Sequence, residues 1–255
     1  QTVCATTATL AGNTATVGTG LWTVIAGSAT VTSPGSPASG VTGLTVGVNS
    51  FVWSISNGVC PASGDTVTIT RDASPTTANA GPDQTVCATT ATLAGNTATV
   101  GAGAWTVIAG SATVTSPGSP TSGVTGLSVG ANTFVWTITN ATCPPANDTV
   151  TITRDESPTT ANAGPDQTVC SASATLSGNT ATVGTGLWTV IAGSASVTTP
   201  GLPTSGVTAL SIGTNMFEWM ISNGVCALTK DTVTITRDAA PTTASAGTDQ
   251  TVCAT

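Results

Sequence analysis

The chain has 255 residues, of which only 6% are charged. It carries eleven acidic and four basic side chains, a net charge of −7 and no histidine. With no basic patch and no apolar stretch of about 18 residues, we expect neither nucleic-acid binding nor membrane insertion. Glu156 and Glu218 are the only glutamates, and no base stands beside the many serines and threonines. General acid–base and nucleophilic catalysis therefore lack their usual groups, and we expect no enzyme and no catalytic residue.

An 83-residue unit recurs along the chain. The sequence Gln-Thr-Val-Cys starts at Gln1, Gln84, Gln167 and Gln250, and residues 1–18 and 84–101 are identical. A period of this length is typical of tandem domains. We expect a first repeat at 1–75 with a truncated first strand, repeats at 76–158 and 159–241, and the start of a fourth at 242–255. The chain would then be a segment of a longer array.

Within the first repeat, apolar and polar residues alternate in four runs. In chain order these contain Ala8 and Leu10, then Trp22 and Val24, then Phe51, Trp53 and Ile55, then Val67 and Ile69. Such alternation predicts strands with one buried face. It also places the tryptophans in the core, which we favour over sugar stacking at the surface. Hydroxyl rows such as Thr66, Thr68 and Thr70 would be solvent faces of ordinary strands.

Turn signals separate these runs. Glycine, asparagine and proline cluster at residues 12–13, 18–20, 33–37 and 57–58. Asn57-Gly58 predicts a type I′ hairpin, which needs positive φ at two successive residues. About seven short strands in roughly 80–90 residues are typical of a Greek-key β-sandwich.

The connection between repeats, residues 70–83, contains two prolines and is expected to be short and stiff. A sandwich of such strands is about 35–40 Å long, so three in line would form a rod of roughly 110 Å. Asp65, Asp72 and Asp83 lie near this connection. They could bind calcium there, but the chain has few acidic residues for a site that needs six to eight oxygens. We expect no resident cofactor.

Seven cysteines recur with the repeat, two in each full unit and 56 residues apart: Cys4, Cys60, Cys87, Cys143, Cys170, Cys226 and Cys253. An even count without histidine or CxxC pairs indicates disulfides and an extracellular location. Spacing does not decide the connectivity.

We favour pairing within each repeat, because extracellular domains usually close their own frameworks. This joins Cys4 to Cys60 and its counterparts, Cys87 to Cys143 and Cys170 to Cys226, with Cys253 pairing outside the chain. The alternative pairs neighbours across repeats, Cys60 with Cys87, Cys143 with Cys170 and Cys226 with Cys253. Within-repeat bonds would close loops of about 57 residues, worth about 4 kcal/mol. A stretched array would then extend only through the 27 residues between Cys60 and Cys87.

A family resemblance rests on three motifs. Ala-Gly-Pro-Asp-Gln-Thr-Val-Cys at residues 80–87 and 163–170, together with residues 51–60 and 65–70, resembles PKD-like and Ig-like repeats of large secreted proteins of Bacteroidetes. The resemblance implies tandem Ig-like or PKD-like β-sandwiches exported to the cell surface, usually by type IX secretion, in stalks similar to the SprB-type gliding adhesin. The chain differs from antibody-type domains in lacking tyrosine for a tyrosine corner. Asp-Thr-Val also resembles the Bacteroidetes O-glycosylation acceptor, which would mark Thr66, Thr149 and Thr232, although a plain strand edge explains it as well.

These observations predict an all-β array of Ig-like sandwiches that acts as a stalk of a cell-surface adhesin. Its partners would be further repeats of the same chain, with surface glycans bound through a tip outside this sequence. Two alternatives remain: a repeated ligand-binding module acting by avidity, and a subunit of an assembled extracellular filament. The third repeat has Glu218 in place of valine and Lys230 in place of glycine or asparagine. A spacer surface tolerates such departures better than a repeated binding site does.

Overall fold

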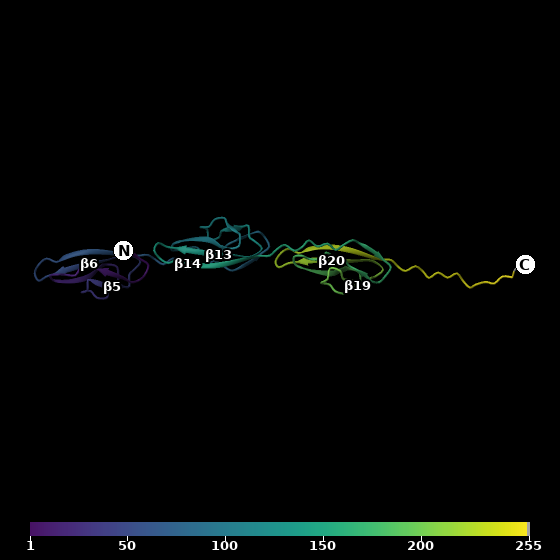
Figure 1. Ribbon diagram of the computed structural model, residues 1–255, viewed down its shortest axis with the longest axis horizontal. Coiled ribbons are helices and arrows are strands. Elements are labelled where there is room, and N and C mark those ends of the chain that lie inside the picture. Colours follow the sequence, from purple (N-terminus) through teal and green to yellow (C-terminus); the bar gives the residue numbers. More distant parts are fainter. Residues whose placement is uncertain (254–255) are drawn as a thin grey trace. The chain divides into compact units, whose positions relative to one another are not determined.

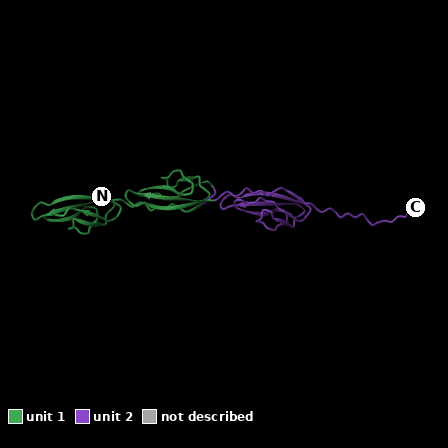
Figure 2. Ribbon diagram, viewed as in Figure 1, with its two compact units in different colours: residues 1–84, 88–154 green, residues 85–87, 155–255 purple. Residues whose placement is uncertain are grey.

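The computed structural model describes residues 1–253, in which the chain forms strands and no helix. It divides into two compact units (Figure 2). The first comprises residues 1–84 and 88–154 and holds two of the sequence repeats, while the second comprises residues 85–87 and 155–255 and holds the third. The rod-like arrangement and the repeat boundaries stay predictions.

Each repeat contributes seven strands, as its turn signals predict. The first contains β1 (Thr2–Val3), β2 (Ala8–Ala11), β3 (Thr19–Ala26), β4 (Thr30–Val31), β5 (Ala38–Thr42), β6 (Gly47–Ser56) and β7 (Ser63–Arg71). The second contains β8 (Gln84–Val86), β9 (Thr90–Thr92), β10 (Ala102–Ala109), β11 (Thr113–Val114), β12 (Gly123–Thr125), β13 (Gly130–Thr139) and β14 (Ala146–Arg154). The third contains β15 (Gln167–Val169), β16 (Ala174–Thr175), β17 (Thr185–Ala192), β18 (Ser196–Val197), β19 (Gly206–Thr208), β20 (Gly213–Ser222) and β21 (Thr229–Arg237).

The strands form two sheets per repeat. In the first repeat the orders are β1-β7-β6-β3 and β2-β5-β4, and in the third they are β15-β21-β20-β17 and β16-β19-β18. β10, β13 and β14 take the corresponding places in the second repeat, where β13 and β14 run side by side (Figure 1). β1 pairs with β7 and β15 with β21 in parallel, whereas the hairpin pairs β6–β7, β13–β14 and β20–β21 are antiparallel. The predicted all-β, Ig-like sandwich is confirmed.

The alternating runs bury the predicted faces. Leu10, Phe51 and Ile69 are at most 1% exposed and belong to one core cluster of the first repeat, and a matching cluster fills the third. Trp22 and Trp53 pair across β3 and β6 with ring centroids 5.1 Å apart. The tryptophans are therefore core residues, as the pattern predicts.

One asparagine per repeat is fully buried, which the sequence pattern does not reveal. Asn49 Oδ1 accepts hydrogen bonds from the backbone N–H and hydroxyl of Thr45. Its Nδ2 donates to the carbonyls of Thr45, Gly47 and Ile69. Because every polar atom of this amide has a partner, its burial is tolerated. Asn132 and Asn215 repeat the arrangement.

The Asn57-Gly58 turn joins β6 and β7 where the sequence predicts it, but its type differs. The N–H of Cys60 donates to the carbonyl of Asn57 at 3.1 Å, and only Gly58 has positive φ. A type I′ turn needs two such residues. Because β7 begins only at Ser63, the loop is longer than the two-residue connection to which that turn is suited.

The proline-containing connection is not a free linker. Its residues 76–83, here called the packing segment, lie along the second repeat. The N–H of Thr76 donates to the carbonyl of Val100, and that of Ala80 to Asp148 Oδ2 at 2.8 Å. Ala78 and Ala80 are buried in the core of this repeat. Residues 159–166 form the packing segment of the third repeat, with Ala161 and Ala163 buried in the same way.

Candidate functional site

Two disulfides link consecutive sequence repeats. Cys4 is bonded to Cys143 and Cys87 to Cys226, with Cα–Cα distances of 4.9 and 5.0 Å and a sequence separation of 139 in both. Each bond joins the first cysteine of one repeat to the second cysteine of the next. The remaining thiols, those of Cys60, Cys170 and Cys253, are exposed and free.

The predicted pairing within repeats is therefore wrong, because the first and last strands of a repeat run parallel. Thr2 pairs with Thr70 and Val3 with Arg71, so Cys4 lies where β7 ends. Cys60 precedes the start of β7, a strand of nine residues. At about 3.3 Å per residue the strand separates the two cysteines by roughly 30 Å. A disulfide spans less than about 7 Å between Cα atoms.

The same reasoning applies to Cys87 and Cys143, and to Cys170 and Cys226, which occupy the corresponding positions. The alternative pairing of neighbours is wrong as well, because Cys87 is bonded to Cys226 and not to Cys60. Cys143 is bonded to Cys4 and not to Cys170. The structure makes the first and last strands of a repeat neighbours, and the sequence alone does not give their relative direction.

Hydrogen bonds surround the first disulfide. Asp72 Oδ2 accepts from the N–H of Thr142 at 3.1 Å and from its hydroxyl at 2.8 Å. Asn140 Nδ2 donates to the carbonyl of Ala73 at 2.7 Å. We call this disulfide, together with the hydrogen bonds made by the aspartate and the asparagine beside it, the clasp. It fastens the residues that follow β7 to the turn between β13 and β14.

The second clasp lies within the second unit. There Asp155 Oδ2 accepts from the N–H of Val225 at 2.8 Å, and Asn223 Nδ2 donates to the carbonyl of Glu156 at 2.7 Å. Gly224 stands between them, and a Cβ on it would lie 1.8 Å from Asp155 Oδ2. A side chain at this position would therefore require Asp155 to shift, and in the first clasp, where Ala141 is the counterpart, Asp72 lies 3.1 Å from the N–H it accepts.

Asp65, Asp72 and Asp83 are the calcium candidates that the sequence offers, and only Asp72 belongs to a clasp. Asp72 instead caps a turn, Asp83 Oδ1 accepts from the N–H of Thr151, and Asp65 Oδ1 accepts from that of Thr66. Within residues 1–253, no three His, Cys, Asp or Glu side chains are grouped so that they could hold a metal ion. Calcium binding at the junctions stays a prediction without a ligand cluster behind it. The glycosylation candidates Thr66, Thr149 and Thr232 are all exposed, which leaves that prediction untested.

The clasp is not apparent from the sequence, although Asp72 and the cysteines attract attention there individually. The signal that could have revealed it is joint recurrence: an aspartate follows the last strand and an asparagine opens the hairpin at the same 83-residue step. Each of these residues alone has an ordinary explanation. Only the parallel direction of the first strand places them beside a disulfide.

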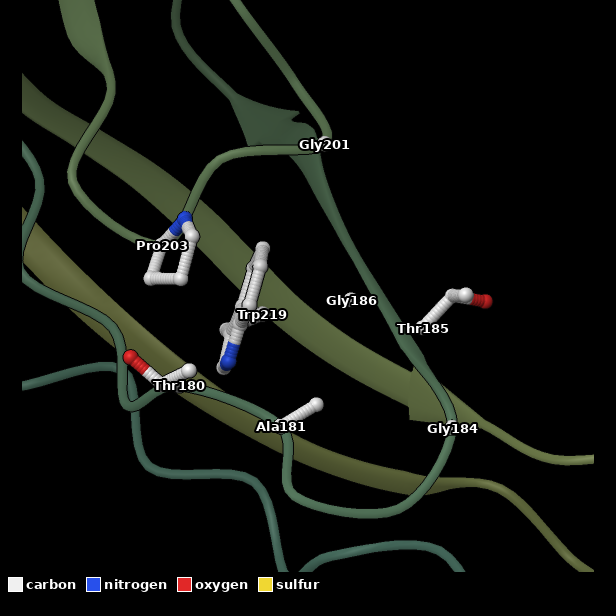
Figure 3. A pocket seen from close by; sticks show the side chains of 8 residues that line it. All are labelled: Thr180, Ala181, Gly184, Thr185, Gly186, Gly201, Pro203 and Trp219. Atoms are coloured by element: carbon white, nitrogen blue, oxygen red, sulfur yellow. The ribbon is translucent and has the colours of Figure 1, made fainter.

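A hollow of about 400 Å³ opens beside the tryptophan pair of the third repeat (Figure 3). Figure 3 shows Trp219 at its centre, with Pro203 on one side and Gly186 on the other. The other lining residues are Thr180, Ala181, Gly184, Thr185 and Gly201. Trp219 is 0% exposed, and its indole N–H donates to Asn179. The lining has no titratable group and offers no exposed aromatic face, so it supports neither catalysis nor sugar stacking.

No family model matches the chain, and no curated protein is similar to it in sequence. Among solved structures, it is similar to immunoglobulin domains 1–5 of Sidekick-1, with 15% identity and a TM-score of 0.40 over 92% of the chain. It spans 58% of the length of that structure. The insect immune protein hemolin gives 10% identity and 0.40, covering 93% of this chain and 74% of hemolin. For human CDH23 EC21-23 the sequence identity is 11% and the TM-score is 0.40, and the match covers 85% of this chain and 88% of that structure. Likeness at this level carries no functional argument.

Proposed function

We propose that the chain is a non-enzymatic stalk or spacer segment of a long extracellular adhesin. The clasp carries this proposal. Each disulfide crosses from one repeat to the next, so it strengthens the connection between repeats more than the interior of any one. A protein that must transmit force along an array gains from such bonds, whereas an isolated binding domain does not.

The proposed location follows from the same bonds. Structural disulfides persist in oxidising surroundings, so the chain belongs to a secreted or cell-surface protein. Within residues 1–253, there is no helix with the length and apolarity to cross a membrane. The finer assignment, to type IX-secreted Bacteroidetes proteins similar to the SprB-type gliding adhesin, rests on the motif resemblance alone. Binding to other proteins or to surface glycans would occur elsewhere in such a molecule.

The deletion of one repeat in register tests the stalk. Removing residues 76–158 places Cys226 at a separation of 139 residues from Cys4, which is the present separation of Cys4 and Cys143. A clasp can therefore still form between Cys4 and Cys226. A stalk predicts that the maximum dimension in small-angle X-ray scattering falls by about 35–40 Å, the length of one sandwich. An unchanged maximum dimension would contradict it. Specific binding of a glycan by the isolated chain would instead favour the avidity module.

A further inference from the structure

The turn held by the second clasp contains the pair Asn223-Gly224. It follows β20 and leads to Cys226, whose N–H donates to the carbonyl of Asn223 at 3.0 Å. Asn223 is half-buried, and Gly224 is exposed. The backbone nitrogen that follows an asparagine can attack the amide carbon of that side chain. Attack is easiest before a glycine, which has no Cβ to keep the two groups apart. The clasp thus holds a reactive pair within reach of water.

The first clasp differs at this one position. Asn140 Nδ2 donates to the carbonyl of Ala73 at 2.7 Å, as Asn223 Nδ2 donates to that of Glu156 at 2.7 Å. Ala141 follows Asn140 and has a φ of 43°, close to the 49° of Gly224. The two turns therefore share the amide contact and a left-handed residue, but only the second leaves the attacking nitrogen unshielded.

The closed clasp holds the Asn223 side chain away from this reaction. To react, its Cγ must lie against the backbone nitrogen of Gly224, at about 3–3.5 Å. Turning the side chain that way breaks its hydrogen bond to Glu156. The turn itself is restrained by the Cys87–Cys226 bond and by Asp155 Oδ2, which accepts from the N–H of Val225. Three restraints thus oppose the reactive geometry while the clasp is closed.

We propose that Asn223 is a site of spontaneous deamidation, which the closed clasp prevents and which reduction of the Cys87–Cys226 bond starts. Two small-molecule thiols give up two electrons and two protons to that bond and are themselves joined as a disulfide. The Gly224 nitrogen then loses its proton and bonds to Asn223 Cγ, the Cγ–Nδ2 bond breaks, and ammonia leaves. Water opens the resulting five-membered ring at either carbonyl. The product is aspartate, or isoaspartate with one more methylene in the main chain.

Either product weakens the clasp for good. The new carboxylate has no N–H to offer the carbonyl of Glu156, and it adds a negative charge close to Asp155, which contacts the same turn. Neighbouring like charges repel, and a carbonyl that loses its donor loses stabilisation. Reoxidation of the thiols does not restore the amide. The site would therefore record that a clasp has once been open, a role that goes beyond the proposed stalk and does not rest on it.

Matched disulfide variants of the 255-residue chain test the proposal. Cys87→Ser with Cys226→Ser removes the second bond, and Cys4→Ser with Cys143→Ser removes the first. Each protein is kept in mildly alkaline buffer made with 18O-labelled water, and mass spectrometry of its peptides follows deamidation of Asn223. Without the restraint, the first variant should deamidate roughly tenfold faster than the unchanged chain. The second variant should differ from the unchanged chain less than about twofold, since its second clasp is intact.

The role of the glycine is tested in the same open clasp. Adding Gly224→Ala to Cys87→Ser and Cys226→Ser should slow deamidation roughly tenfold, because the new Cβ shields the nitrogen. Asn140 in the variant without the first bond should be as slow, since Ala141 follows it. The indole N–H resonances of the buried Trp219 should stay unchanged, which shows that the third repeat remains folded.

The polar half of the clasp is tested with the disulfide intact. Asp155→Ala removes the contact to Val225 and should raise the deamidation rate about threefold. Asp166→Ala is its control, because Asp166 Oδ1 accepts from the N–H of Thr234, outside the clasp, and it should leave the rate unchanged. This pair decides the matter if the serine variants fail to fold.

The product is tested through a substitution that stands in for it. Asn223→Asp should shift the equilibrium of the Cys87–Cys226 bond with glutathione about fivefold toward the thiols, whereas Ser222→Asp adds the same charge without removing a hydrogen bond and should shift it less. The proposal is overturned if Asn223 deamidates equally fast in the two disulfide variants, or if Gly224→Ala does not slow it. Equal rates for Asp155→Ala and Asp166→Ala, or equal shifts for the two added aspartates, also overturn it.

Discussion

The clasp makes a specific prediction for a chain stretched between Gln1 and Cys170. In a Cys60→Ser, Cys253→Ser background, Cys170 is the one thiol outside the two disulfides and accepts a maleimide handle. With the observed bonds, load passes from Gln1 to Cys4, across to Cys143 and on to Cys170. That path contains about 30 residues, so at about 3.6 Å each the end-to-end distance cannot exceed roughly 110 Å.

Reduction removes this limit. All 169 residue steps between the handles then extend, to about 610 Å. Optical-tweezers traces before and after a reductant is added measure both limits. With Cys60 replaced, pairing within repeats would keep only the Cys87–Cys143 bond in the path and leave about 113 residues, or roughly 405 Å. An oxidised limit near that larger value would refute the connectivity and with it the clasp.

Three substitutions, with Gly118→Ala as a control, test the close packing, a strained backbone position and the buried amide, each followed by thermal and denaturant unfolding. Gly103→Ala should cost about 3 kcal/mol, because its Cβ would lie 2.1 Å from the ring of Trp136, whereas Gly118→Ala, with nothing within 4 Å, should change little. Equal effects of the two would contradict the close packing. Ala209→Gly should stabilise by about 1 kcal/mol, because this alanine has a φ of 57°, and a loss of stability would argue against strain there. Asn132→Ala should cost about 3 kcal/mol by leaving several buried backbone groups unpaired, so a neutral result would mean that water replaces the amide.

The strands and the core were predictable from the sequence because alternation acts locally. Residues two apart on a strand share a face, so the positions of Leu10, Phe51 and Ile69 follow from neighbouring residues alone. The disulfides depend on the direction of a two-residue strand, β1, relative to β7. No local pattern encodes that direction, which explains why the cysteine pairing was missed.

The packing segment shows a second limit. Alanine, threonine, glycine and proline in residues 76–83 are typical of a linker. Ala78 and Ala80 are nevertheless buried against the second repeat, at 9% and 0% exposure. Small side chains in this segment accompany close packing against the rest of the repeat. The same composition is also typical of a flexible linker, so composition alone does not distinguish the two.

Two departures in the third repeat have a common explanation. Glu218 and Lys230 appear independent in the sequence, but Lys230 Nζ lies 2.9 Å from Glu218 Oε1 across β20 and β21. The sequence feature that could have revealed this ion pair is that both positions change together in the third repeat. As a partly exposed ion pair it contributes little stability, so the tolerance expected of a spacer surface still applies.

The two disulfides overlap along the sequence, since Cys87 lies inside the loop closed by Cys4 and Cys143. A single backbone cleavage anywhere between Cys4 and Cys226 therefore leaves both fragments covalently joined, and between Cys87 and Cys143 they are joined twice. Pairing within repeats would have left every connection between repeats as a point where one cut separates the molecule. If an extracellular protease cuts the chain once between Cys4 and Cys226, the two overlapping disulfides therefore keep the fragments joined, and the cut opens the backbone only locally.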